Sequence, residues 1–587
     1  MNLKSPRFVL LLGLLLILIG GFIAWNVQTD GGQIEIKDVR FMGTNGVQMS
    51  ALLYIPPGVS AETPAPGILA IHGYINSRET QAAYAIEFAR RGYVVLALDQ
   101  TGHGYSDPPA FANGFGGPDG LAYLRSLDIV DKDNIGLEGH SMGGWASLVA
   151  TAIYPDGYKA INIQGSSTGT FGAPEGTAES PRNIAVTFST WDEFSELMWG
   201  SPTGAGVVNT DKLKTLFGTD EAVVPDQLYG SIEDGTARIL YQPVTTHPGD
   251  HLNSAAVGTA IGWMQQTLVG GNGLDPNNQV WQWNEIGRLA ALIGMVISMI
   301  GFGGVLLETS YFQSLVQPMP EARPSQGRMR YVGWLLAMFI PVITYFWFFN
   351  QFTPLSQTFG LPSALMPQNI TTQVVIWAFG SGAILLVLFL IWHFTSNKGA
   401  SLANYGVTFN VGVILKSLLL AVVVFLFGYM LLYFAGLVFL IDFRFWVVAI
   451  KLMESLQFRI FLGYLPFFIV YFVVMLTMLH GQHRVVRSDG SDVGMARAML
   501  ANVGLLVVGF IVLLLVQYIP LLAGQTLPFG ESLNTIVAFQ FVGLLTIVGV
   551  MTTYFFRKTG TIFTGAFVSA LFITWAIVAA QATHFAF

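Results

Sequence analysis

The sequence predicts an α/β domain, built on a mostly parallel sheet flanked by helices, joined to an all-α transmembrane bundle of about nine helices in total. Strand-like and helix-like segments alternate between residues 26 and 283, which is typical of a parallel sheet covered by helices. Residues 134–147 read NIGLEGHSMGGWAS, where a short apolar run meets a serine framed by glycines and then a helix-forming segment. Hydrophobic residues make up 52% of the chain and charged residues only 11%, so long apolar segments must lie in a membrane.

The charged residues divide the chain in the same way. Residues 26–283 contain 12 Lys and Arg against 27 Asp and Glu, a net charge of −15, whereas the remainder has a net charge of +8. An acidic soluble domain and a basic membrane domain explain this division, and the acidic surface argues against nucleic acid as a partner. The 587 residues include no cysteine, which excludes disulfides and thiol chemistry.

Three domains are predicted along the chain. Residues 1–25 form an N-terminal transmembrane anchor with a cytoplasmic N-terminus, because the bulky residues after its apolar run do not fit a signal-peptide cleavage site. Residues 26–283 form the α/β domain, and residues 284–587 form a polytopic membrane domain with about eight helices. The spans predicted in that domain are 286–307, 331–350, 372–394, 413–440, 459–479, 499–519, 534–556 and 561–583.

The loops between these spans predict the orientation in the bilayer. Basic residues gather in every second loop, whereas the loop at 351–370 carries no charge and the loop at 520–533 carries only Glu531. The positive-inside rule then places the basic loops in the cytoplasm and the α/β domain outside it. Nine spans give an external C-terminus.

The membrane half gives few signs of its own chemistry. Its predicted spans hold almost no charge away from their ends, which argues against an ion-coupled transporter. Residues 442–458 mix apolar and charged residues at helical spacing, and are interpreted either as a helix lying flat at the outer interface or as a packed loop helix. A scaffold, a lipid-access surface and a partner-binding body all remain open as roles for this half.

Ser141 stands where a strand turns sharply into a helix. Residues 135–137 supply the strand and residues 142–153 the helix, while Gly139 and Gly143 stand two residues before and two after the serine. Glycines at these positions let the strand and the helix approach closely around a strained nucleophile. The helix N-terminus also offers backbone N–H groups that can hold an oxyanion.

The chain around this serine resembles the α/β-hydrolase family over roughly residues 33–268. Residues 65–71 look like the third strand of that family and end in His72-Gly73-Tyr74, and residues 99–106 (DQTGHGYS) are similar to its D-x-x-G-H-G-x-S loop. The resemblance implies an oxyanion hole made by the backbone amides of Tyr74 and Met142. It also implies that His72, His103 and His140 order loops and are not bases.

The same resemblance places an acid and then a histidine after the serine in chain order. Two histidines, His247 and His251, lie in the loop that follows the last expected strand. His251 is favoured as the base because it follows a short Pro-Gly-Asp turn and precedes the Asn253 helix start, whereas Pro248 biases His247 towards an extended backbone. A metal site of His247, Asp250 and His251 is the alternative, although no metal and no cofactor is expected.

The acid is expected after the penultimate strand, at residues 183–188. Asp192 is the first carboxylate after that strand and is taken as the acid. Its neighbour Glu193, and further along the chain Asp220 and Asp226, are the other candidates.

The expected protein is a membrane-anchored, extracytoplasmic serine hydrolase of the carboxylesterase or lipase type, with a catalytic triad of Ser141, Asp192 and His251. Its expected partners are the lipid bilayer and a small-molecule or lipid-like acyl substrate, an ester or a thioester, which follows only from the membrane setting. A peptidase or an acyltransferase with the same triad is one alternative, because the serine motif does not name the acceptor. A non-enzymatic membrane binding or scaffold protein with a hydrolase-like domain is the other.

Overall fold

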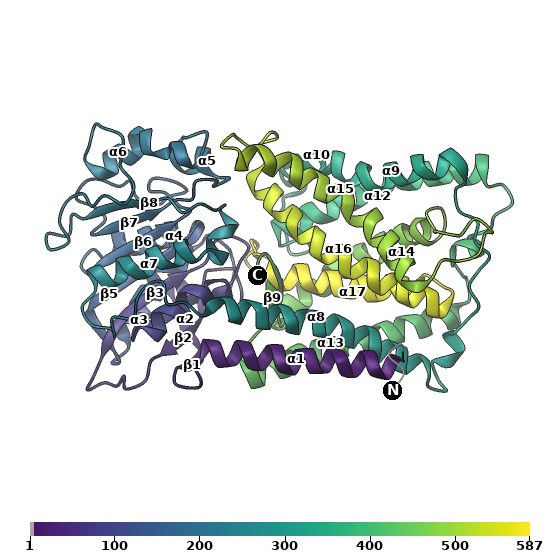
Figure 1. Ribbon diagram of the computed structural model, residues 1–587, viewed down its shortest axis with the longest axis horizontal. Helices are drawn as coiled ribbons and strands as arrows, with labels where there is room; N and C mark the ends of the chain where they lie inside the picture. Colours follow the sequence, from purple (N-terminus) through teal and green to yellow (C-terminus); the bar gives the residue numbers. More distant parts are fainter. Residues whose placement is uncertain (1–4) are drawn as a thin grey trace. The chain divides into compact units, whose positions relative to one another are not determined.

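The chain forms two compact units in a computed structural model that describes residues 5–587 (Figure 1). The sheet unit comprises residues 22–287 together with two later segments, 517–532 and 580–587. The helical unit comprises residues 5–21, 288–516 and 533–579. The first four residues of the predicted anchor lie outside the described residues.

The sheet unit is built on one eight-stranded sheet with the order β1-β2-β4-β3-β5-β6-β7-β8. β2 pairs antiparallel with β1 and β4, and every other neighbouring pair is parallel, which confirms the predicted mostly parallel sheet. The strands are β1 (Glu35–Met42), β2 (Gln48–Ile55), β3 (Ala65–Ile71), β4 (Val94–Asp99), β5 (Val130–His140), β6 (Ala160–Gln164), β7 (Ile184–Thr187) and β8 (Arg238–Tyr241).

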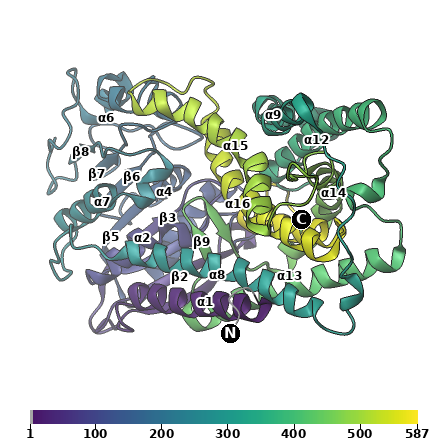
Figure 2. The same ribbon diagram turned by 45° about the vertical axis from the view of Figure 1, so that its right-hand side comes forward.

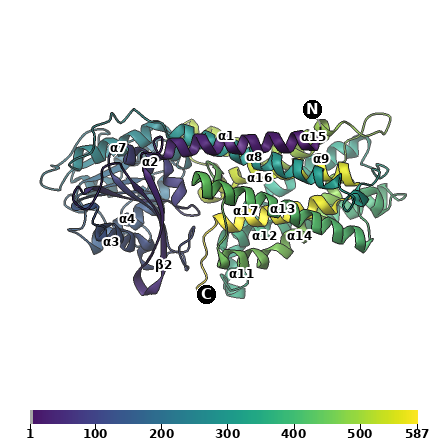
Figure 3. The same cartoon turned by 90° about the horizontal axis from the view of Figure 1, so that it is seen from below.

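Helices cover both faces of this sheet, with α2 and α7 on one face and α3 and α4 on the other (Figure 3). Successive residues of β3 point to opposite faces, so Ile68 joins the core under α2 and α7 while Leu69 joins the core under α3 and α4. This explains why the central strands read as continuous apolar runs. The helices of the unit are α2 (Ala82–Arg90), α3 (Gly117–Ser126), α4 (Met142–Ile153), α5 (Ser195–Trp199), α6 (Asp211–Phe217) and α7 (Ser254–Thr267).

Nine helical spans among residues 5–587 are long and apolar enough to cross a membrane, in agreement with the predicted number. The third of them runs from Gly327 to Asn350 and is interrupted at Thr344 after Pro341, so that it appears as α9 and α10. The remaining helices are α1 (Pro6–Gln28), α8 (Trp281–Leu307), α9 (Gly327–Ile343), α10 (Tyr345–Asn350), α11 (Phe352–Phe359), α12 (Asn369–Ser396), α13 (Val411–Phe439), α14 (Ser455–His480), α15 (Met495–Leu522), α16 (Ser532–Thr559) and α17 (Phe563–Ala580).

Small residues allow close helix packing in the helical unit. A side chain at Gly13 of α1 would come within 2.6 Å of the Gly294 carbonyl of α8, so the backbones of these two helices nearly touch. The two helices run side by side in Figure 1, and α12 lies beside α9 and α14 in Figure 2. Close backbone approach through glycine is a common source of helix association in lipid.

The segment at 442–458 differs from the predicted helix. It begins as a two-stranded antiparallel hairpin of β9 (Phe443–Phe445) and β10 (Val448–Ile450), and only its last residues belong to α14. Arg444 donates hydrogen bonds to Asp442 at 2.9 Å, so these two of the segment's charged residues pair with each other. The short alternation of apolar residues around Trp446, which has a φ of +53°, fits a tight hairpin better than a helix.

Candidate active site

Ser141 occupies a strained turn between β5 and α4. Its backbone has φ 55° and ψ −120°, a conformation that a non-glycine residue rarely adopts. A side chain at Gly139 would collide with the Gly143 carbonyl, and a side chain at Gly143 would collide with the Ile71 carbonyl. The glycines therefore permit the close approach of strand, turn and helix, as the sequence predicts. The Ser141 amide donates to the Gln164 carbonyl at 2.7 Å, which anchors the turn to β6.

The loop after β3 lies directly beside this turn. A side chain at Gly73 would come within 3.1 Å of the Ser141 Cβ, so the adjoining Tyr74 amide belongs to the surroundings of the serine. Met142 is the first residue of α4, and its amide is one of the N–H groups that the helix itself does not use. These are the two amides expected to form the oxyanion hole.

Buried polar side chains hold that loop in place. The Gln100 amide donates to His72 Nε2 at 3.1 Å, which puts the proton on Nδ1, and Nδ1 donates to the Gly73 carbonyl at 2.6 Å. Asp99 accepts hydrogen bonds from the Arg78 amide at 2.8 Å and the Tyr105 amide at 3.0 Å. The D-x-x-G-H-G-x-S segment therefore orders the loop that carries the Tyr74 amide.

Asp192 and His247 meet at the carboxyl ends of β7 and β8. A parallel bridge between Trp191 and Thr246 brings the two following loops together. His247 Nδ1 lies 2.8 Å from Asp192 Oδ2, so Nδ1 carries the proton and Nε2 is left as the basic nitrogen. Gly165 leaves room for the pair, because a side chain there would come within 2.8 Å of His247 Nδ1.

Electrostatics favour the protonated form of His247. Burial alone would lower its pKa, because its side chain is almost inaccessible to water. The charge of Asp192 and its hydrogen bond, together with the charges of Glu193 and Asp250, outweigh burial and raise the pKa of His247 above its ordinary value. An imidazolium formed during a reaction would be stabilised in the same way.

This arrangement differs from the expectation that His251 pairs with Asp192. Residues 248–252 form a short 3₁₀ helix, and His247 adopts helical angles of φ −51° and ψ −55° in spite of the following proline. Its ring therefore turns towards Asp192. His251 lies instead against the rings of His140 and Tyr84, at centroid distances of 4.3 and 6.0 Å.

His140 and Asp250 form a buried support beneath the His247 loop. His140 Nε2 donates to the His247 carbonyl at 3.0 Å and lies 3.4 Å from Asp250 Oδ2. Ser189 Oγ donates to the other oxygen of Asp250 at 2.5 Å. The suggested metal ligands are thus held apart by separate partners, and no group of three His, Asp or Glu among residues 5–587 is placed to hold a metal ion.

Glu193, considered in the sequence only as a substitute acid, contacts the backbone of the loop that contains His247. Its Oε2 accepts a hydrogen bond from the His247 amide at 2.7 Å, and its Oε1 accepts one from the Tyr518 hydroxyl at 2.5 Å. Burial, and secondly the charge of Asp192, raise the pKa of Glu193 to about 7. The adjacent Asp192-Glu193 pair was visible in the sequence, but nothing there indicated Tyr518, which lies 325 residues further on.

A row of aromatic side chains runs past the serine turn. Its neighbouring rings lie within 6.4 Å of one another, centroid to centroid. The row consists of Tyr74, Phe111, Phe115, Trp145 and Phe171. Two members, Phe111 and Phe171, have positive φ angles of 74° and 48° and are exposed, which places apolar rings at the surface near Ser141.

The last residues of the chain lie against the same loops. Thr583 exchanges backbone hydrogen bonds with Gly102 and Ala110, each at 2.8 Å. His584 Nε2 lies 3.0 Å from the Tyr74 hydroxyl, and burial lowers the pKa of His584 to about 4.

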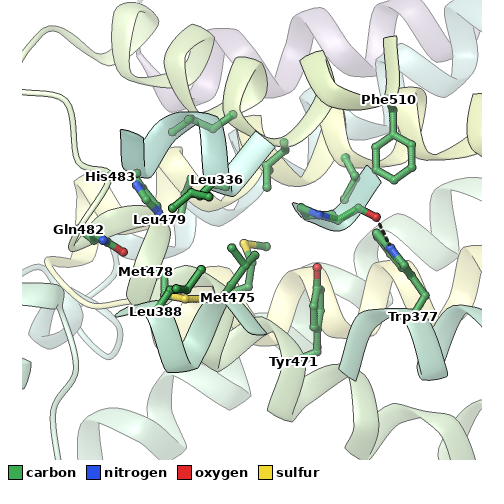
Figure 4. Close-up of a pocket in the computed structure, with 17 residues that line it drawn as sticks. Leu336, Trp377, Leu388, Tyr471, Met475, Met478, Leu479, Gln482, His483 and Phe510 are labelled. Atoms are coloured by element: carbon green, nitrogen blue, oxygen red, sulfur yellow. Dashed lines mark hydrogen bonds between the residues drawn. The ribbon is translucent and has the colours of Figure 1, made fainter. Parts of the chain in front are cut away.

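The helical unit contains a pocket of a different character (Figure 4). Side chains from α9, α12, α14, α15 and α16 enclose a cavity of about 70 Å³. Its walls are mainly Leu, Met and aromatic residues, and Trp377 Nε1 donates to the Pro341 carbonyl at 2.7 Å on one side. His483 and Gln482 are polar members at one end, and no Asp, Glu, Lys or Arg is among the residues that line it.

Comparisons with known proteins agree with the fold of the sheet unit. Residues 66–191 match the sequence profile of the alpha/beta hydrolase fold family. A stretch of 127 residues is 32% identical to dipeptidyl peptidase 8 of Mus musculus and of Homo sapiens, and covers 19% of this chain. The chain spans only 14% of the length of these relatives, so their activity does not transfer to it.

Solved structures with local likeness belong to several kinds of hydrolase. An esterase from Pyrococcus furiosus is 15% identical over 41% of this chain and 96% of its own, with a TM-score of 0.29. A thioesterase domain from the curacin biosynthetic pathway is 14% identical over 39% of this chain and 98% of its own, with a TM-score of 0.27. Epoxide hydrolase A from Mycobacterium thermoresistibile is 19% identical over 24% of this chain and 42% of its own, with a TM-score of 0.20.

The eight-stranded sheet, the strained serine turn and the family match at residues 66–191 lead to one assignment. The chain carries an alpha/beta hydrolase fold domain, accompanied by nine membrane-length helical spans among its described residues.

Proposed function

We propose that the protein is a membrane-anchored serine hydrolase that cleaves an ester or a related acyl bond. The nucleophile is Ser141, the base is His247 and the orienting acid is Asp192. The observation that carries this proposal is the 2.8 Å contact between His247 Nδ1 and Asp192 Oδ2. The serine adjoins that pair through its chain neighbour His140, whose ring is 4.6 Å from the His247 ring, centroid to centroid, and it is held in a strained strand-to-helix turn. A serine hydroxyl is a weak nucleophile at neutral pH, and an oriented base is what activates it.

The reaction follows from these roles. His247 Nε2 accepts the Ser141 hydroxyl proton as Oγ bonds to the acyl carbon, and the resulting oxyanion accepts hydrogen bonds from the Met142 and Tyr74 amides. His247 then returns the proton to the leaving group, which departs as the acyl-enzyme forms. Water, deprotonated by His247, attacks the acyl-enzyme, and His247 gives this proton to Ser141 Oγ as the bond between Oγ and the acyl carbon breaks and the acid leaves. Asp192 holds the imidazole in the required tautomer throughout.

The substrate proposed is an ester or thioester with an apolar acyl group. The row of aromatic rings from Tyr74 to Phe171 supports this choice, because it presents apolar surface beside the serine turn. The membrane-length helices also support a lipid-like substrate, because an enzyme that they hold in a bilayer is close to lipids. The active site is proposed to lie outside the cytoplasm, on the strength of the basic loops on the opposite side of the predicted spans.

A peptidase is the second candidate, because the 127-residue match is to a protein named as a peptidase. A panel of p-nitrophenyl esters with short to long acyl chains, dipeptide amides and an epoxide separates these chemistries on the full-length protein. We expect turnover of the esters, faster for the longer chains and absent in Ser141→Ala. Turnover of only the dipeptide amides would favour the peptidase, and activity that survives Ser141→Ala would contradict the proposal.

A further inference from the structure

Residues 517–532 run from the last turn of α15 to the first residue of α16, yet they belong to the sheet unit. The segment is tied together internally, since the Phe529 amide donates to Gln517 Oε1 at 3.0 Å and Gln517 Nε2 donates to the Gly530 carbonyl at 3.3 Å. Both of its ends reach one residue of the sheet unit: the Tyr518 hydroxyl donates to Glu193 Oε1 at 2.5 Å, and Ser532 Oγ donates to the Glu193 carbonyl at 2.5 Å.

Glu193 in turn contacts the backbone of the proposed base. Its second carboxylate oxygen, Oε2, accepts the His247 amide proton at 2.7 Å, so one side chain joins Tyr518 to His247. Only 7% of Glu193 is exposed, and a carboxylate this deeply buried depends on its hydrogen-bond donors to remain charged. Removing the Tyr518 hydroxyl therefore makes Glu193 less often charged and weakens the hydrogen bond that Oε2 accepts from the His247 amide.

We propose that Tyr518 is a positioning residue for the hydrolytic reaction, acting through the Glu193 carboxylate to hold the His247 backbone, and thus the imidazole, in its reactive position. The inference rests on the proposed function and extends the active centre to a segment between two membrane-length helices. These helices then do more than anchor the enzyme, because the last turns of α15 supply a hydrogen bond on which the base depends.

The positioning role of Tyr518 should be visible in the pH dependence of activity, because Tyr518 affects the ionisation of Glu193. Asp192, His247 and Tyr518 face Glu193, while Asp192, Glu193 and Asp250 act on His247. The hydrogen bond from Tyr518 lowers the pKa of Glu193, so its loss raises that pKa further above about 7 and leaves the side chain more often neutral. A neutral Glu193 no longer raises the pKa of His247, so the acid limb of the activity profile moves to lower pH.

The test compares Tyr518→Phe, Glu193→Gln and the double variant in full-length protein reconstituted in lipid nanodiscs. Tyr123→Phe is the matched control, since this ring stacks on Phe41 elsewhere in the sheet unit. We expect kcat to fall about tenfold in Tyr518→Phe with little change in KM, the acid limb to shift to lower pH, and the double variant to be no worse than Glu193→Gln. Tyr123→Phe should keep the wild-type kcat and profile.

A wild-type kcat and acid limb in Tyr518→Phe would overturn the proposal, and so would additive losses in the double variant. If Tyr518→Phe does not fold, Glu193→Gln decides, because an unchanged acid limb in that variant removes the link to His247. The proposed function fails by a different result, namely activity that persists in Ser141→Ala.

Discussion

Three hydrogen bonds hold the side chain and the backbone of His247. Its ring is held by Asp192, its amide by Glu193 and its carbonyl by His140, so the imidazole is fixed from three directions. His251 shares the loop, but its ring packs at a tilt against the ring of His140. The two histidines stand four residues apart at the start and within a short 3₁₀ helix, and they face different partners, which supports His247 as the proposed base.

Alanine substitutions should separate the two histidines. His247→Ala is expected to lower kcat by ~10⁴ or more, as for loss of a triad base, while His251→Ala should lower it by no more than about tenfold through loop disorder. Steady-state kinetics on folded protein at matched concentration measures both. The opposite ranking would return the base to His251.

The pH dependence of kcat/KM should report the same imidazole. A general base must be neutral, and the pKa of His247 is raised above its ordinary 6.5, mainly by Asp192 acting against burial. Activity is therefore expected to fall as the pH is lowered through a value above 6.5. In Asp192→Asn the limb should move to lower pH along with a large loss of kcat. A limb that stays in place in that variant would show that another group titrates.

At the scale of secondary-structure elements, the serine turn depends on the glycines that surround it. β5, the loop after β3 and the start of α4 converge so closely that a side chain at Gly143 would overlap the Ile71 carbonyl. Backbone atoms cannot yield as a flexible side chain can, so the turn has no alternative packing.

Gly143→Ala should therefore destabilise the sheet unit by about 2 kcal/mol or more and remove most activity. Gly262→Ala is the matched control, because it lies in α7 and an added Cβ would have its nearest neighbour at 3.9 Å. That change should leave activity intact and should not lower stability, since alanine favours a helix. Thermal unfolding and ester turnover measure both variants, and a stable, active Gly143→Ala protein would refute this account of the turn.

Elements set by local pattern were predictable, and those set by distant contacts were not. The β3 strand and the α4 helix occupy the residues that were predicted, because apolar runs and the glycines around Ser141 define them locally. The hairpin of β9 and β10 was missed, because three-residue strands hardly distinguish alternation from helical spacing. The choice between His247 and His251 depends on the Trp191–Thr246 bridge, which joins two loops far apart in the sequence.

At the scale of the whole molecule, the sheet unit gathers three separate stretches of the chain. The segments 517–532 and 580–587 contact Glu193 and Tyr74, which lie hundreds of residues earlier. Hydropathy predicted the membrane-length helices well, because a span is a local property of about 20 residues. It could not predict that the segments between and after these helices would join the other unit.

The proposed orientation can be tested with single cysteines, because the native sequence contains none. Single cysteines at Lys132→Cys, exposed in the sheet unit, and at Ser488→Cys, exposed in a basic loop, give two unambiguous reporters. A membrane-impermeant maleimide should label the first in intact cells and the second only after lysis. The reverse pattern would place the active site in the cytoplasm, and equal labelling of both reporters in intact cells would also contradict the predicted topology.

The central claim is that Ser141 is an activated nucleophile, and covalent labelling tests it most directly. Full-length protein in nanodiscs is treated with a fluorophosphonate, which reacts with activated serines, and the modified peptide is located by mass spectrometry. We predict one modification, at Ser141, that is absent from Ser141→Ala and greatly slowed in His247→Ala but only slightly slowed in His251→Ala. Labelling at a different serine, or undiminished labelling of Ser141→Ala, would contradict the account.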